Sequence, residues 1–389
     1  MRLEKRGGFG RRSLCAGFLL FLFGSASGPA TARDRVDVEA LARSLESYVT
    51  GLQSNIIWDR TDVVDGEIQL RNFYLPTGDG GVFGFDVAYL REFYRNDDRW
   101  VVGQFRLPYR AIQVEDGTFS LDSIGLFGLR VPAAPPRSTP DAVPLDFDQL
   151  TLRSFALSLG YQRVLGLDDS HVTAEIAPDG DSVRYSGAIE AIHLHSEPIR
   201  NPQVKALLTG LGYPEPSGFL EFDASVEGGR SSPARVSVDK LDLTVLDAAA
   251  LRISAELTAP ASGGAPATDR HRADIRFKAE EAALRSLRLR FENETLVPRL
   301  LAWLGGGDGA TTMAKYQVLG AFGALAGPFL SGEEAAQSAT ALSAFLDDPQ
   351  VLEIELTAKQ PIRLAALSDP AYRAGLRELI SVTVAANPD

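Results

Sequence analysis

The sequence predicts an α+β fold that is mainly β: a large antiparallel sheet, curved and open or closed into a sandwich, with a helical insertion near the C-terminus. Two observations carry this prediction. Apolar and polar residues alternate over much of the chain up to residue 292, which is typical of strands with one buried face. After Glu294 the apolar residues recur at helical spacing instead.

The N-terminal third begins with one predicted helix. Over residues 36–52, apolar residues such as Leu41 and Leu45 recur every three or four positions. Alternation then predicts strands at 67–72, 101–107, 112–114 and 119–129. The prolines between Pro132 and Pro144 predict a linker or a long surface loop.

Strand patterning resumes after the Pro-rich segment, and only one helix, at about 202–211, interrupts it. The predicted strands are 145–159, 172–176, 183–194, 219–226, 236–245 and 251–257. A Gly-, Ala- and Pro-rich stretch at 260–268 predicts a second flexible break, followed by a strand pair at 273–279 and 283–292.

The C-terminal part is predicted to be largely helical. A leucine stripe from Leu296 to Leu304 predicts a helix that Gly305-Gly306-Gly307 stops, and Asn293-Glu294-Thr295 suits its cap. The apolar segment Met313–Leu330 is either a buried helix or a lid that touches lipid, and it is too interrupted to span a bilayer. Another helix is expected at 333–346, and strands at 351–356 and 382–384 flank a helix at about 370–380.

These patterns divide the chain into six predicted segments. They are a signal peptide (1–32), an N-terminal helix and β-rich segment (33–131), a Pro-rich linker or loop (132–144), a second β-rich segment (145–292), the helical insertion (293–348) and the C-terminal strands and helix (349–389).

The first 32 residues have the three parts of a cleavable export signal. Five basic residues are followed by an apolar run from Leu14 to Phe23, which is too short to span a bilayer. Ala30-Thr31-Ala32 then offers a cleavage site, with Ser25-Ala26-Ser27 as an alternative. We therefore expect a periplasmic or secreted protein, exported by the general or the twin-arginine route, with no stable transmembrane span in its mature form.

Cysteine content and charge limit the function of the mature chain. The only cysteine, Cys15, lies in the leader, so disulfides, cysteine-ligated zinc and thiol nucleophiles are not expected. The leader holds five of the 39 basic residues and one of the 51 acidic ones, which leaves 34 against 50, a net charge of −16. A nucleic-acid partner is not expected, because such partners require clustered lysine and arginine.

Motif searches predict no catalytic residue, no cofactor site and no metal site. His193 and His195 share one strand face, as metal ligands can, but no third ligand is indicated, and we interpret them as solvent-facing. The acid pairs Asp168-Asp169 and Asp347-Asp348 are interpreted as turn residues rather than as a general acid and base.

A degenerate strand template recurs along the chain. Gly66–Leu75 and Gly117–Leu126 both match Gly-x-apolar-x-Leu-x-polar-apolar-x-Leu, and Gly187–Leu194 and Val238–Leu243 are shorter relatives. In residues 60–130 and 185–245 the sequence resembles AsmA-like envelope proteins of Gram-negative bacteria. The resemblance implies curved sheets whose apolar inner face handles lipid, although those proteins usually keep an N-terminal membrane anchor, which here is predicted to be cleaved.

Three functional hypotheses follow. The first is a non-enzymatic envelope protein that binds or shields an apolar ligand such as lipid. The second is a structural or interaction module with a filled core, whose partners would be other envelope proteins, and the third is an unrecognised hydrolase. Under the first hypothesis, an apolar lid hinged at Gly305-Gly306-Gly307 covers the ligand, and its predicted residues are Leu300, Leu301, Trp303, Leu304, Phe322, Leu325, Phe329 and Leu330.

Overall fold

The computed structural model describes most of the chain after Trp58. The described residues are 40–41, 44–45, 58–64, 67–76, 82–96, 99–114, 117–132, 147–177, 182–199, 201–228, 232–260, 281–306, 311–364 and 370–388. Several predictions lie outside them: the signal peptide (1–32), most of the helix at 36–52, the Pro-rich segment after Pro132, the break at 261–268 and the strand at 273–279.

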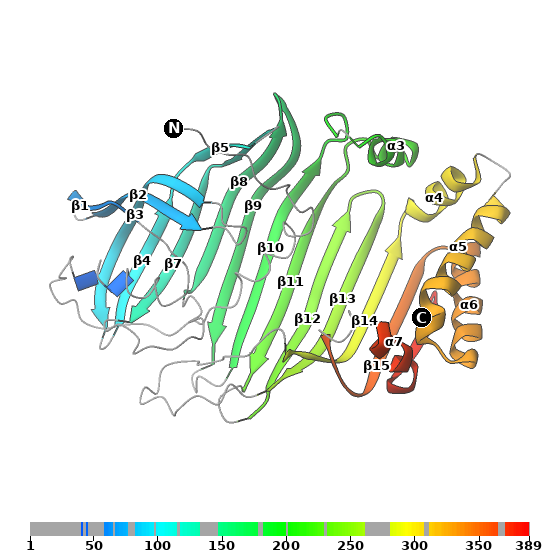
Figure 1. The fold of residues 1–389 in the computed structure, drawn as a ribbon. Helices are drawn as coiled ribbons and strands as arrows, with labels where there is room; N and C mark the ends of the chain where they lie inside the picture. Colours follow the sequence, from blue (N-terminus) through cyan, green and yellow to red (C-terminus); the bar gives the residue numbers. More distant parts are fainter. Residues whose placement is uncertain are drawn as a thin grey trace. The chain divides into compact units, whose positions relative to one another are not determined.

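Sixteen strands are described, and the pairings between them are antiparallel (Figure 1). They are β1 (Arg60–Val64), β2 (Glu67–Pro76), β3 (Val82–Asn96), β4 (Arg99–Leu107), β5 (Arg110–Val114), β6 (Gly117–Leu121), β7 (Ser123–Pro132), β8 (Gln149–Leu159), β9 (Gln162–Ile176), β10 (Ser182–Leu194), β11 (Ser217–Glu227), β12 (Ala234–Val245), β13 (Ala249–Ala259), β14 (Ala283–Asn293), β15 (Val351–Arg363) and β16 (Ile380–Ala386).

Helices gather in the C-terminal half of the chain. They are α3 (Pro202–Gly210), α4 (Leu296–Gly305), α5 (Thr311–Ala326), the 3-10 helix η2 (Gly327–Phe329), α6 (Gly332–Asp347) and α7 (Pro370–Leu379). No helix of the described part is long and apolar enough to cross a membrane.

The predicted fold class is confirmed: the protein is mainly β, with a large antiparallel sheet and a helical part near the C-terminus. Of the two architectures expected, the sheet is open, because its strands pair in an order that does not close. Gly306 adopts φ +76° directly after α4, so the predicted glycine stop of this helix is also confirmed.

Some strands were missed or shortened in the sequence prediction. β1 and β3 were not predicted at all, and β9 begins ten residues before the predicted strand at 172–176. In β3 the alternation of buried and exposed residues is interrupted, because the adjacent residues Val87 and Ala88 are both buried. Further along the strand, Glu92 has a positive φ of 54°. The two copies of the strand template also differ: the first lies in β2, whereas the second is divided between β6 and β7.

Two compact units divide the chain. The first comprises Met1–Pro108 and Ser123–Leu150, and the strands β1, β2, β3, β4 and β7 pair in that order within it. Its core is well filled, with Ile68, Leu90 and Val102 fully buried. The helical residues Leu41 and Leu45 are buried too, and the Trp100 indole donates a hydrogen bond of 3.0 Å to Ser44.

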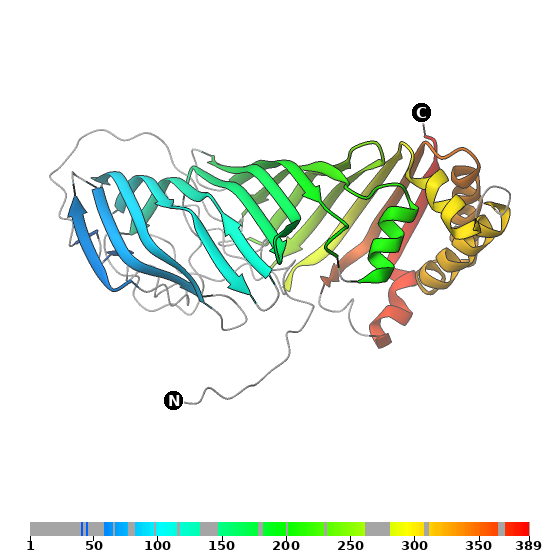
Figure 2. The same cartoon turned by 90° about the horizontal axis from the view of Figure 1, so that it is seen from above.

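The second unit comprises Tyr109–Asp122 and Thr151–Asp389. Its strands follow one another as a meander through β9, β10, β11, β12, β13, β14, β15 and β16. The helix α4 packs on α5, α5 packs on α6, and α6 packs on β16, the last strand of the meander (Figure 2). The edge of this sheet is therefore covered by helices rather than left open for further strand pairing.

Candidate functional site

The sheet of the second unit has an apolar and a charged face, and the strand register assigns residues to each. Residues directly opposite one another across a strand pair share a face, and side chains alternate between faces along each strand. Ile189 pairs with Leu220, which pairs with Leu243, which pairs with Leu251. The same face continues through a second row, in which the opposite pairs run Phe222, Leu241, Ile253 and Leu289.

We call these eight residues the apolar strip. It crosses β10, β11, β12, β13 and β14, and it contains only leucine, isoleucine and phenylalanine. Seven of its members are half-buried, and Leu243 is 37% exposed. At the other end of the same strands, the side chains on this face are buried, for example Val183, Val226 and Val236. Toward the β12–β13 turn the same face is covered again, since Ala249 is buried, so exposure on this face is greatest within the strip, at Leu243.

Helices cover the apolar face on two sides of the strip. Phe291 on β14, Leu352 on β15 and Ala386 on β16 lie opposite one another across the strand pairs. They pack against a cluster of buried side chains from α4, α5 and α6. At the end of the strands, Val245 packs against a cluster from α3 and α4 that is centred on Leu211 and Tyr213. None of the clusters that the described helices form includes a residue of the apolar strip.

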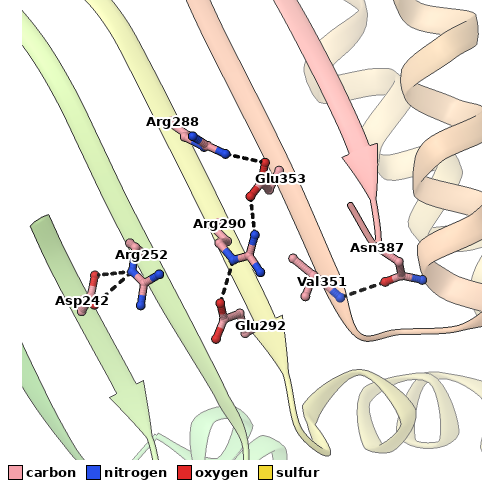
Figure 3. Close-up of polar contacts among 8 residues, drawn as sticks. All are labelled: Asp242, Arg252, Arg288, Arg290, Glu292, Val351, Glu353 and Asn387. Atoms are coloured by element: carbon pink, nitrogen blue, oxygen red, sulfur yellow. Dashed lines mark hydrogen bonds and ion pairs between the residues drawn. The ribbon is translucent and has the colours of Figure 1, made fainter. Parts of the chain in front are cut away.

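The opposite face of the same strands carries paired charges. Arg252 on β13 donates to Asp242 on β12 at 3.1 Å, and Arg290 on β14 contacts Glu353 on β15 at 2.5 Å (Figure 3). Nearer the start of the unit, Arg184 contacts Asp223 at 2.5 Å. We call this face the charged ladder. Because its charges are paired across strands, this face is suited to face water.

Glu353 is the most buried acid of the charged ladder. Only 9% of its side chain is exposed, and it accepts hydrogen bonds from Arg288 at 2.9 Å and from Arg290. Burial by itself raises the pKa of this carboxyl, but the two guanidinium groups together outweigh burial and hold the pKa below its usual value of 4.5.

Substitution of Glu353 by Gln is expected to lower the free energy of unfolding by about 1–3 kcal/mol at pH 7, because two guanidinium groups lose their buried acceptor. A depressed pKa stabilises the fold above pH 4.5, and this contribution is lost as the pH falls through the lower folded-state value. Denaturant unfolding from pH 7 to pH 3 should therefore show the two proteins converging in acid.

The matched control is Glu355→Gln. Glu355 lies two residues along the same strand face and contacts Arg288 at 3.3 Å, but its side chain is 51% exposed. A surface ion pair of this kind contributes about 0–1 kcal/mol. Equal losses for the two variants would show that the burial of Glu353 has no special role.

The eight predicted lid residues do not form one face. Leu301 and Phe322 belong to the cluster over β14–β16, whereas Leu300 belongs to the cluster of α3 and α4. Phe329 packs against a third cluster, which contains Ile362. Leu330 is buried, whereas Trp303 and Leu304 are 42% and 37% exposed. The side chain of Leu325 lies outside the described residues. The lid itself remains a prediction, and so does its hinge, of which Gly307 is not described.

The helix α5 is neither wholly buried nor wholly exposed. Ala314, Val318 and Phe322 pack toward the core, while Met313 and Tyr316 are 63% and 66% exposed. The expectation of a buried helix at Met313–Leu330 thus applies to one side of α5 only.

The polar residues singled out in the sequence lie apart. His193 is 3.4 Å from Asp168, and His195 is 3.3 Å from Glu215, so the two rings have different partners. Asp168 and Asp169 lie inside β9, and their interpretation as turn residues was wrong because the start of this strand was not predicted. In the part of the chain that the structure describes, no group of three His, Cys, Asp or Glu residues could hold a metal ion.

The segment Asn293-Glu294-Thr295 lies at the start of α4, as predicted; Thr295 is the N-cap residue, and Asn293 supplies the side-chain hydrogen bond. Its side-chain oxygen accepts a hydrogen bond of 2.7 Å from the backbone N–H of Val297 in the first turn of α4.

Comparisons with known proteins add one observation. A family model described as "Uncharacterized protein" matches residues 242–387. The match begins near the end of β12 and includes the helices α4, α5, α6 and α7 and the last strand, β16. A comparison with curated proteins found no match.

The sequence analysis missed the apolar strip as a site. The strands that carry it were predicted, and alternation placed their leucines and isoleucines on one face. Alternation is the same for a strand face covered by a core and for one left half-exposed. Only the register and the positions of the helices distinguish the two.

Proposed function

We propose that the chain is an exported, non-enzymatic envelope protein that binds the acyl chains of a lipid on the apolar strip. The observation that carries the proposal is a partly exposed surface of eight large apolar side chains, seven of them half-buried, with the paired charges gathered on the opposite face. Contiguous exposed apolar surface on a soluble domain is typical of ligand or membrane contact.

The dimensions and chemistry of the strip suit an acyl chain. Five strands at about 4.8 Å spacing give a surface about 20 Å wide. Each methylene group transferred from water onto such a surface contributes about 0.8 kcal/mol. The strip carries no charged residue to recognise a headgroup, so the proposal concerns the apolar part of the lipid.

Two sequence features support the same function. The leader over residues 1–32 would bring the protein to the compartment where envelope lipids lie, and the strand templates resemble AsmA-like proteins. Membership of that family is part of this proposal.

The second candidate function is an interaction module with a filled core. The observation that favours it is the buried part of the apolar face at Val183, Val226 and Val236, where the side chains are covered as they would be in a filled core. The two candidates differ in what they predict for the half-exposed strip.

Titration with a fluorescent fatty acid tests the proposal. The variant Leu241→Gln/Ile253→Gln, in the middle of the strip, should bind at least tenfold more weakly than the natural protein, because two amides would lie under the acyl chain. The matched control is Thr244→Gln/Ser254→Gln, which places the same side chain on the charged face of the same strands.

The control should bind as the natural protein does, and circular dichroism should be the same for all three proteins. No binding by the natural protein, or equal binding by both variants, would contradict the proposed site and favour the filled module.

A further inference from the structure

Most of the exposed apolar residues of the second unit gather at one end of its sheet. Among the described residues of this unit, large hydrophobic side chains with more than a third of their surface exposed occur in the β8–β9 turn, α3, the β12–β13 turn, α4 and the start of α5, and also at Tyr109 before β5 and at Leu243 of the apolar strip. The most prominent are Leu246, Trp303, Leu304, Met313 and Tyr316, which we call the apolar end.

The parts that carry the apolar end are fixed to one another. The Tyr213 hydroxyl is 2.6 Å from that of Thr295, and Thr295 also donates to the carbonyl of Asp247 in the β12–β13 turn. Arg299 lies over the Tyr213 ring and donates to the carbonyl of Leu211 at 3.2 Å. Leu246 and the α4 residues are therefore presented on a rigid support rather than on a loose loop.

Trp303 is held by close packing. A Cβ atom at Gly210 would lie 2.5 Å from Cδ1 of Trp303, so the indole rests on the last turn of α3. Its remaining surface faces outward, with 42% of the residue exposed. This ring is thus exposed despite a packing partner that fixes its orientation.

We propose that the apolar end docks on the surface of a lipid bilayer. Tryptophan and tyrosine are enriched where proteins meet the membrane–water interface, because their rings are apolar and carry one polar group. On the same face Leu243 is followed by Val245, which α3 and α4 cover, so the strip ends under the helices that carry the apolar end. Docking here would bring these helices, and with them that end of the strip, to the lipid surface.

The charges around the apolar end indicate which bilayer it suits. The acids Asp247 and Glu294 and the bases Lys205 and Arg299 are all exposed there, so no basic patch is formed. Binding should therefore depend on apolar insertion and not on anionic headgroups, which attract clustered lysine and arginine. The inference rests on the proposed function, and it adds the partner that delivers or receives the lipid.

Flotation with phosphatidylcholine vesicles tests the docking. The natural protein should float with the vesicles, and 30% phosphatidylglycerol should change binding by less than about twofold. The variant Leu246→Ser/Trp303→Ser/Leu304→Ser should bind vesicles at least tenfold more weakly and should bind the fluorescent fatty acid as before. The matched control is Val63→Ser/Val64→Ser/Tyr74→Ser in the first unit, where the side chains are 54%, 44% and 38% exposed.

Tryptophan emission gives a second readout that needs no disruptive variant. Of the three tryptophans, Trp100 is buried and Trp303 is exposed, so vesicles should shift the emission of the natural protein to the blue. The Trp303→Phe variant should lose most of this shift and keep its flotation.

The outcomes separate docking from the function on which it rests. Fatty-acid binding without flotation, or flotation of the triple serine variant equal to that of the natural protein, would overturn the docking alone. Self-association that the triple variant abolishes, without any vesicle binding, would assign the surface to a second copy and overturn the bilayer. Absence of fatty-acid binding by the natural protein would contradict the proposed function.

Discussion

Replacement of Phe345 by Ala is expected to lower the free energy of unfolding by about 3–5 kcal/mol. Phe345 on α6 is 3% exposed, and its ring meets that of Phe291 on β14 edge to face, with centroids 6.0 Å apart. The substitution removes this aromatic pair and leaves a cavity in the cluster that joins α4, α5 and α6 to the sheet. Urea unfolding followed by circular dichroism measures the loss.

Leu304→Ala is the matched control for this substitution. Leu304 lies in the same helical part but is 37% exposed, so its truncation should cost about 0.5 kcal/mol or less. A small loss for Phe345→Ala would show that the helices are only loosely attached to the sheet, which would favour a mobile lid over a fixed cover.

Replacement of Phe322 by Asp is expected to cost about 2–4 kcal/mol and to detach α5 from its cluster. Phe322 packs against the cluster over β14–β16, and a carboxylate there would lack a partner. For a unit of this size the loss corresponds to a fall in melting temperature of about 4–16 °C. The control is Gln317→Asp, which places the same charge on the exposed side of the same helix.

The two variants distinguish a cover from a lid. If the helices form a fixed cover, Phe322→Asp should destabilise the helical part, while the apolar strip on β10–β14 still binds fatty acid under native conditions. If they form a lid, the β signature and stability should persist and lipid binding should be lost. An unchanged fold with unchanged lipid binding would contradict both interpretations of α5.

Local pattern was sufficient to predict most of the fold. The strands β10 to β14 and the helices α4 and α6 lie within a few residues of their predicted positions, because each has one clear apolar face and a recognisable end. Asn293 accepts a hydrogen bond from a backbone N–H in the first turn of α4, and Gly306 ends the same helix with a positive φ. Both roles are typical of these residue types, so the sequence alone predicts them. By contrast, β3 was missed because its buried residues do not alternate regularly: Val87 and Ala88 are adjacent and both buried, and Glu92 further along has a positive φ.

The site could not be predicted in the same way, because it depends on contacts between distant residues. The leucine stripe Leu300–Leu304 appears uniform in sequence, yet the structure divides it among two clusters and an exposed surface. Likewise, the charge pairs Asp242–Arg252 and Arg290–Glu353 depend on a strand register that no short motif specifies. Among the described residues, the helices pack on either side of the strip and not on it.

Native mass spectrometry of the protein, produced with its leader and purified without detergent, tests lipid binding on the apolar strip most directly. We predict a species heavier than the polypeptide from Arg33 onward by the mass of one or two lipids. That species should be absent from Leu241→Gln/Ile253→Gln and present in Thr244→Gln/Ser254→Gln. The bare polypeptide mass for the natural protein, under conditions that keep lipid on a control lipid-binding protein, would contradict the account.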